Sequence, residues 1–157
     1  MTSMDYLVFL DTRAGELEKI LSGVKSMIVK EFVSAQSAEQ PVRPDDSLYF
    51  LRDNDECDVR VKATVVRVLA CEKGQHEDLS HILKELQTRL QLTEEQYNYW
   101  STRKQALFIE FEAAQKIPEI HIASEKIIDR TGWMVLAENG PVTEERVKNG
   151  SGNNFTG

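Results

Sequence analysis

The chain of 157 residues is long enough for one domain with a sizeable core and leaves little room for a second. Its formal net charge of −7 counts against binding of nucleic acid through bulk positive charge, although it is compatible with a small basic groove. The longest apolar runs fall far short of the ~20 residues of a membrane span, and no secretory signal pattern is visible. Because the 2 cysteines are also too few for a disulfide scaffold, we expect a cytoplasmic protein with no membrane partner.

The N-terminal half is expected to form a strand, a helix and three further strands. Residues 6–10 are a short apolar run typical of a buried strand. Asp11 offers an N-cap for a helix over residues 12–22, and Gly23 can supply the left-handed residue that ends it. The three further strands are predicted at residues 26–32, 47–51 and 58–70.

The last of these strands changes phase along its length. Its apolar residues alternate with polar ones up to Val65, and from Val66 onward they fall on the opposite face. Since a β-bulge shifts the alternation by one residue, we predict a bulge near residues 65–67.

The C-terminal half opens with two predicted helices. The first spans residues 76–91 and carries an apolar stripe that we expect to be core. The stripe consists of Leu79, Ile82, Leu83, Leu86 and Leu90. Residues 93–96 form a capping box that opens the second helix, which is expected to carry Tyr97, Trp100 and the pair Arg103 and Lys104.

Strands are then predicted over residues 106–113, 120–122 and 133–136, the last two at sheet edges. A single domain is expected over residues 1–137, followed by a polar tail over 138–157. The element order predicts an α+β fold: a small mixed β-barrel of about five or six strands with two or three flanking helices.

The segment from residue 20 to residue 30 resembles the signature of the ASCH family, a branch of the PUA-like barrels. Gly23 and Lys25 match its Gly-x-Lys element, and Lys30 stands at its later basic position. Ile28 departs from the pattern, because the family usually has Glu or Thr there. Asp45 replaces the glycine of a Pro-Gly-Asp turn before a strand. The resemblance covers roughly residues 5–125 and implies a PUA-like barrel.

The resemblance implies non-enzymatic recognition of RNA or a nucleotide-like ligand in a cleft beside the first helix. Lys25, near the mouth of the barrel, and Arg13 would contact phosphate or a base edge, with Lys30 as outer support. An odd spacing in a strand would put Lys25 and Lys30 on opposite faces, unless Lys25 still belongs to the turn. Tyr49 and Trp133 are the candidates for stacking on a base. The alternative is that the basic residues are solvated surface charges and the aromatic ones pack.

Two other functions stay open. Some ASCH members are proposed to be small amidohydrolases acting on an acylated modified nucleoside, using a Lys, a Thr three residues later and a Glu. Lys25 matches, but Ile28 has no nucleophilic atom, so this activity is not expected here. The helical region 76–104 could instead serve a protein-interaction or regulatory module, and the oligomeric state, monomer or weak dimer, is left open.

No metal or cofactor is expected. His76, His81 and His121 do not have metal-ligand spacing, and no glycine-rich phosphate loop is present. Glu110 and Glu112 share one face of a predicted strand. We interpret them as its solvent face, opposite the basic residues Arg60 and Lys62.

Overall fold

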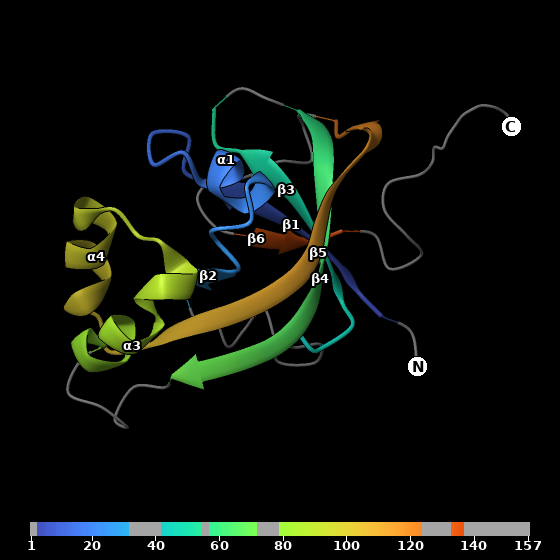
Figure 1. Ribbon diagram of the computed structural model, residues 1–157. Helices are drawn as coiled ribbons and strands as arrows, with labels where there is room; N and C mark the ends of the chain where they lie inside the picture. The colour runs from blue at the N-terminus through green and yellow to red at the C-terminus, as the bar shows by residue number, and fades with distance from the viewer. Residues whose placement is uncertain (1–2, 32–41, 55–56, 72–78, 124–132, 137–157) are drawn as a thin grey trace, which may run out of the picture.

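The described part of the chain forms one strongly curled, six-stranded sheet with helices packed against it (Figure 1). The computed structural model describes residues 3–31, 42–54, 57–71, 79–123 and 133–136. Its elements are β1 (Asp5–Leu10), α1 (Glu16–Leu21), β2 (Met27–Lys30), β3 (Ser47–Arg52), β4 (Asp58–Cys71), α3 (Ser80–Leu90), α4 (Glu94–Ser101), β5 (Ala106–His121) and β6 (Trp133–Val135).

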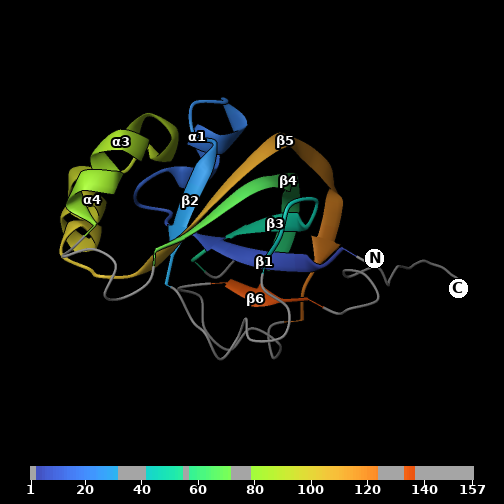
Figure 2. The same ribbon diagram turned by 90° about the horizontal axis from the view of Figure 1, so that it is seen from below.

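The sheet has the strand order β2–β5–β4–β3–β1–β6. Strands β1 and β3 run parallel, and the other neighbours are antiparallel. The sheet curls into a half-barrel, with α1 at one end of the curl and α3 and α4 beside β2 (Figure 2). This arrangement confirms the predicted α+β class with six strands and flanking helices. No helix of the described residues is long and apolar enough to cross a membrane.

The long pair β4–β5 gives the sheet its curvature. Their register shifts at three places, between Val59 and Val61, between Lys62 and Thr64, and between Val65 and Arg67. The third shift confirms the predicted bulge. Each extra residue bends its strand and increases the local twist, so a pair of this length wraps around the core instead of lying flat.

Strand β5 is longer than predicted. We expected strands over 106–113 and 120–122, separated by a break at Pro118, whereas one strand runs through this residue. Pro118 has no amide hydrogen, but it lies within the register shift opposite Val59 and Val61, where β5 has two residues more than β4 and the ladder is interrupted. The shift therefore accommodates the proline, and the prediction of a separate edge strand is wrong.

Helix α1 begins at Glu16, four positions later than predicted. The side chain of Asp11 accepts hydrogen bonds from the amides of Arg13 (2.9 Å) and Ala14 (3.2 Å), and so caps a turn that precedes the helix. Gly15 then adopts a left-handed φ of 66°, which a continuous helix cannot contain. The predicted C-terminal end is confirmed, because Gly23 has a φ of 88° directly after the last turn.

The capping box of α4 is also confirmed. Thr93 Oγ1 accepts from the amide of Gln96 (3.1 Å), and Gln96 Oε1 accepts from the amide of Thr93 (3.0 Å). The helix ends at Ser101, so Arg103 and Lys104 follow it and do not belong to it as expected. Helix α3 is described from Ser80, and the first residues of its predicted range lie outside the described residues.

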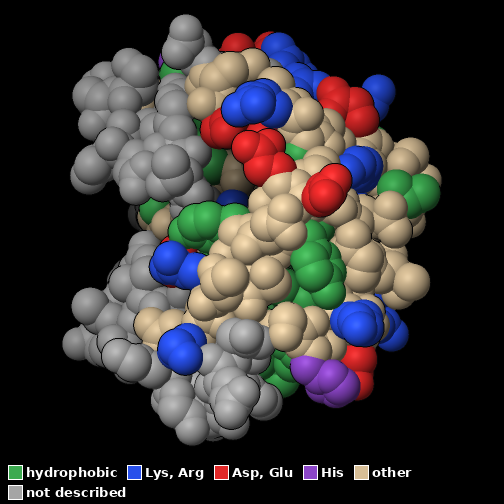
Figure 3. Space-filling model, turned by 90° about the vertical axis from the view of Figure 1, so that its left-hand side faces the viewer, with side chains coloured by type: hydrophobic (Ala, Val, Ile, Leu, Met, Phe, Trp, Pro, Cys, Tyr) green, Lys and Arg blue, Asp and Glu red, His purple; other side chains and the backbone are tan. Residues whose placement is uncertain are grey.

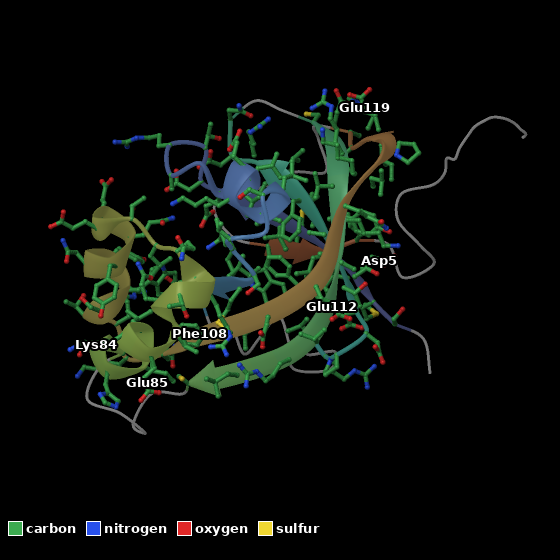
Figure 4. All side chains as sticks on the ribbon, in the orientation of Figure 1. Asp5, Lys84, Glu85, Phe108, Glu112 and Glu119 are labelled. Carbon is green, nitrogen blue, oxygen red and sulfur yellow. The ribbon has the colours of Figure 1, made fainter. Side chains whose placement is uncertain are left out.

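Two large apolar clusters lie on either side of the sheet. One fills the inside of the curl beneath α1, and the other lies between β2, β5 and the helices α3 and α4. The predicted stripe is confirmed as core: Leu79, Leu83 and Leu90 are fully buried against Phe108. On the outer side of α3, Lys84 and Glu85 face solvent (Figure 4).

Strand β6 forms one edge of the sheet, and acidic residues of β5 form ion pairs with arginines. Strand β6 pairs with β1 at the sheet edge, as predicted, whereas the predicted tail 138–157 lies outside the described residues. Glu110 lies near Arg67 (3.0 Å) and Arg89 (3.4 Å), and Arg60 pairs with Glu119 (2.7 Å) near the other end of the β4–β5 pair. The expectation that Arg60 and Lys62 lie opposite Glu110 and Glu112 is wrong, because the register shifts move both basic residues further along β5.

Candidate functional site

A cleft of about 450 Å³ opens between the turn after β1, the end of β2 and helix α4. The surface on this side of the molecule is visibly hollowed, with acidic side chains along the upper side of the hollow (Figure 3). The apolar part of the lining includes Phe9, Val29, Leu92, Tyr99 and Trp100. Its charged and amide side chains are Asp11, Arg13, Glu16, Lys30, Glu31, Asp53, Glu95 and Gln96.

Glu16 organises the floor of the cleft. The residue is 9% exposed, and its side chain accepts hydrogen bonds from the amide of Asp11 (2.7 Å) and from Gln96 Nε2 (3.2 Å). The same carboxylate lies 3.5 Å from Lys25 Nζ. Because Gln96 also donates toward Asp11 Oδ2 (3.5 Å), one amide side chain joins α4 to the turn after β1. A buried carboxylate with this many donors has a fixed position.

Lys25 lies behind this floor and does not line the cleft. It is 2% exposed, and its ammonium donates to the carbonyl of Leu90 at 2.5 Å. Lys19 likewise donates to the carbonyl of Gln91 (3.0 Å), so two lysines satisfy carbonyls at the C-terminal end of α3. Burial lowers the pKa of Lys25 to about 8, while the nearby Glu16 carboxylate acts in the opposite direction. The expectation that Lys25 emerges at the mouth of the barrel is wrong.

Lys30 takes the place at the cleft that was expected for Lys25. It is half-buried at the end of β2, lines the cleft, and donates to the carbonyl of Phe9 (2.6 Å). Desolvation lowers its pKa, and the carboxylates of Glu16 and Asp53 act against that shift. Lys25 precedes β2, so strand alternation does not separate it from Lys30, and the two ammonium groups are close enough to interact.

Arg13 stands in the exposed turn at the cleft rim. The turn is held by Asp53, whose Oδ1 accepts from the amide (3.1 Å) and hydroxyl (2.7 Å) of Thr12. Arg13 therefore lies before α1 and not at its first turn, and at the cleft it is accompanied by Lys30, whereas the prediction paired it with Lys25.

The opposite wall is formed by α4. Tyr99 and Trp100 contact each other edge to face, with ring centroids 5.1 Å apart. The hydroxyl of Tyr99 donates to Glu31 (3.0 Å), which also accepts from Arg103 (3.0 Å). The guanidinium of Arg103 lies 5.0 Å from the centre of the Tyr99 ring. These contacts tie the aromatic wall to the end of β2.

Tyr49 and Trp133 lie away from the cleft. Tyr49 is 5% exposed in a cluster that also contains Leu51 and Val59, and Lys62 Nζ lies 5.5 Å from its ring centre. Trp133 packs on Tyr6, with ring centroids 5.0 Å apart. Neither residue lines the cleft, so the structure does not bring them together with Arg13 or Lys30.

Ile28 is 1% exposed and lies inside the curl of the sheet, paired with Ile109. The position at which the amidohydrolase arrangement would need a nucleophile is therefore part of the apolar core. Among the described residues, no group of three or more His, Cys, Asp or Glu side chains is placed to hold a metal ion.

Sequence reasoning missed Glu16, Gln96 and Tyr99. Gln96 was visible as the last residue of a capping box, but its contact with Glu16 joins residues 80 positions apart. Glu16 sits in an ordinary charged segment, and Tyr99 is one of several aromatic residues on α4. They are distinguished only by contacts between distant residues, that of Gln96 with Glu16 and that of Tyr99 with Glu31.

No protein-family model and no curated protein sequence matches this chain. Among solved structures, the ASCH protein from Zymomonas mobilis is similar, with a TM-score of 0.62 and 12% identity over 87% of this chain and 90% of that one. A serine-to-alanine variant of that protein gives a TM-score of 0.64 at 14% identity, covering 92% and 94% of the two chains. A tyrosine-to-phenylalanine variant gives 0.65 at 13% identity, covering 92% and 96%. The chain has the ASCH fold, a PUA-like half-barrel, and the predicted resemblance is confirmed at the level of the fold.

Proposed function

We propose that this ASCH-fold chain binds a small nucleoside-like ligand in the cleft beside α1 and does not act on it chemically. The observation that carries the proposal is the lining of the cleft: an aromatic wall on α4, made of Tyr99 and Trp100 edge to face, lies opposite a floor of fixed hydrogen-bonding groups. Its volume of about 450 Å³ falls within the range of small-molecule sites. A nucleoside presents the matching features, a flat ring with donors and acceptors on its edge.

The polar groups suit a base edge because they include both donors and acceptors. An ammonium group has three donors, and Lys30 uses one of them on the carbonyl of Phe9, which leaves donors for a ring carbonyl. The rim carboxylates Glu31 and Asp53 offer acceptors for amino groups. Tyr99 and Trp100 offer ring surface, and stacking on an aromatic side chain contributes roughly 1–3 kcal/mol per base.

A single nucleoside is favoured over an RNA strand because the lining is acidic. Arg13 and Lys30 are the cationic side chains among the lining residues, against five carboxylates. Binding of an RNA backbone depends on neutralising several phosphates with basic side chains. The cleft offers few such contacts, which also agrees with the net charge of −7.

The positions of Lys25 and Ile28 support binding without hydrolysis. The lysine at the family's motif position, Lys25, is committed to the carbonyl of Leu90 and to Glu16. The residue three positions later, Ile28, is buried and has no nucleophilic atom. A nucleophile must lie within reach of the substrate, and neither residue lines the cleft.

The test is isothermal titration calorimetry of the full chain against the four ribonucleosides and a short single-stranded RNA. We expect saturable binding of at least one nucleoside, weakened about fivefold or more in Tyr99→Ala, because a stacked ring is lost. Arg13→Ala should weaken binding as well. Arg60→Ala is the matched control, since this exposed arginine does not line the cleft and pairs with Glu119 near one end of the β4–β5 pair.

The proposal fails if no nucleoside binds, or if Tyr99→Ala and Arg13→Ala leave the affinity unchanged while circular dichroism shows them folded. Binding of RNA alone would favour the nucleic-acid function instead. Release of acetate from N4-acetylcytidine by the pure chain would favour the amidohydrolase.

A further inference from the structure

The carboxylates at the mouth of the cleft indicate what charge its ligand carries. We infer that the preferred ligand is a nucleoside whose ring carries a positive charge, as ring-N-alkylated bases do, and which carries no phosphate. The inference rests on the proposed function and adds the charge of the ligand to it.

The lining of the cleft carries more negative than positive charge. The lining contains five carboxylates and two cations, Arg13 and Lys30. Two further cations lie against lining carboxylates from outside the cleft: Lys25 against Glu16 at 3.5 Å, and Arg103 against Glu31 at 3.0 Å. The carboxylates still outnumber the cations when both are included. A phosphate group in this cleft would meet like charge, and a cation would meet opposite charge.

The lysine ammonium groups and the exposed carboxylates lie at different depths of the cleft. Lys30 Nζ is turned toward the carbonyl of Phe9 at the floor, and Lys25 Nζ toward the carbonyl of Leu90 behind it. In contrast, Asp53 and Glu95 are exposed residues of the lining, and Glu31 is half-buried at the end of β2. The two ammonium groups are thus turned into the protein, whereas three of the five lining carboxylates stand at the opening, where Arg13 is the one cation of the lining.

The aromatic wall of the cleft also favours a cationic ligand. The ring of Tyr99 already has one flat cation over it, the guanidinium of Arg103 at 5.0 Å. Trp100 lines the cleft beside it and belongs to the residue type with the strongest attraction for cations. A flat cationic ring stacked here would gain from the aromatic faces and from the carboxylates together, whereas a neutral ring would gain chiefly from stacking.

The experiment compares nucleosides that differ mainly in ring charge. Cytidine, 3-methylcytidine and 5-methylcytidine are titrated into the full chain by calorimetry at slightly acidic pH, where the 3-methyl ring is cationic and the 5-methyl ring is neutral. Adenosine with 1-methyladenosine, and guanosine with 7-methylguanosine, extend the comparison to purines. We expect at least one cationic ring to bind about fivefold or more tightly than its parent, the neutral 5-methylcytidine to bind like cytidine, and each 5′-monophosphate to bind more weakly than its nucleoside.

Glu95→Gln and Glu94→Gln provide a matched pair of variants. Both remove one negative charge from the exposed first turn of α4, but only Glu95 lines the cleft. Glu95→Gln should weaken binding of the cationic ring more than binding of the parent ring, by about twofold or more, whereas Glu94→Gln should change neither affinity.

The outcomes separate the inference from the proposed function. If nucleosides bind but the cationic and parent rings bind equally, or the monophosphates bind most tightly, the inference is overturned and the proposed function stands. If no nucleoside of either kind binds, both are overturned.

Discussion

Two buried carboxylates lie at opposite ends of the parallel β1–β3 pair, and their partners differ. Asp46, directly before β3, is 1% exposed and accepts from the amides of Met4 and Arg43, both at 2.9 Å. Its own backbone carbonyl accepts from the amide of Val65 (2.8 Å). All of these donors are backbone groups, so this carboxylate is part of the frame that joins three strands.

Glu16 follows β1 at the other end and depends on side chains. One donor is a backbone amide, that of Asp11, while Gln96 and Lys25 reach it from two other elements. Asp46, which accepts from backbone amides, therefore stabilises the turn before β3. Glu16, which contacts side chains of other segments, stabilises the shape of the cleft. The comparison predicts that substitutions at the first end change stability alone, whereas substitutions at the second end change stability and ligand affinity together.

The largest expected effect is that of Asp46→Ala. The change leaves two amides without their charged acceptor in a buried position, and should lower the free energy of unfolding by about 3 kcal/mol. Urea denaturation followed by circular dichroism measures the loss. Nucleoside affinity of the folded fraction should stay unchanged, and a loss below about 1 kcal/mol would contradict the role given to this carboxylate.

A smaller loss is expected for Glu16→Gln, about 2 kcal/mol, because the amide oxygen can still accept from Asp11 while buried Lys25 loses its counter-ion. Lys25→Met in the same chain should recover part of the loss, since no unpaired charge then remains. Urea denaturation of the two single variants and the double variant gives the coupling. Strictly additive losses would show that the pair does not interact.

The pH dependence of stability distinguishes the two ends further. The pKa of Lys25 is lowered by burial to about 8, so between this value and its ordinary value near 10.5 the unfolded chain binds more protons than the folded one. Stability should therefore rise from pH 8 toward pH 10, by roughly 1 kcal/mol per pH unit, and the lowered pKa of Lys30 acts in the same direction. Above that range, the pKa values of Tyr6 and Tyr49, raised to about 12, act against it.

Thermal or urea unfolding across this range checks the slope. Lys25→Met should flatten it, whereas Lys84→Met, a change at an exposed lysine on α3, should not. A slope that is unchanged in Lys25→Met would show that Lys25 titrates near its ordinary pKa.

The smallest expected effect concerns the two aromatic residues that were predicted to stack on a base. Tyr49 is buried away from the cleft and Trp133 packs on Tyr6, so Tyr49→Phe and Trp133→Phe should leave nucleoside affinity within about twofold of the parent chain. Calorimetry with the tightest nucleoside checks this. A loss of affinity as large as that in Tyr99→Ala would show that the ligand binds near Tyr49 or Trp133 and not in the cleft.

Local patterns predicted the fold because the physical causes are local. The phase flip at Val65 predicted the bulge, and Thr93 with Gln96 predicted the start of α4. Asp45 illustrates the same point: it stands where the ASCH pattern has glycine, and it takes the left-handed φ of 80° that favours glycine.

The site could be predicted only in part because its contacts are distant in sequence. A lysine after a helix end resembles a surface residue, yet Lys25 is buried by its contact with Leu90, 65 positions later. The pattern singled out Arg13 and Lys30, which both line the cleft, but the wall that faces them comes from α4. The sequence does not reveal which helix closes the cleft until the fold has brought Gln96 of α4 within hydrogen-bond distance of Glu16 of α1.

The most direct test of the central claim is amide chemical-shift mapping of the ¹⁵N-labelled full chain during titration with the tightest nucleoside. The account predicts saturable shifts at Arg13, Lys30, Glu31 and Gln96, and none at Asp46. Shifts that centre on the Asp46 end, or an absence of shifts up to the solubility limit of the nucleoside, would contradict it.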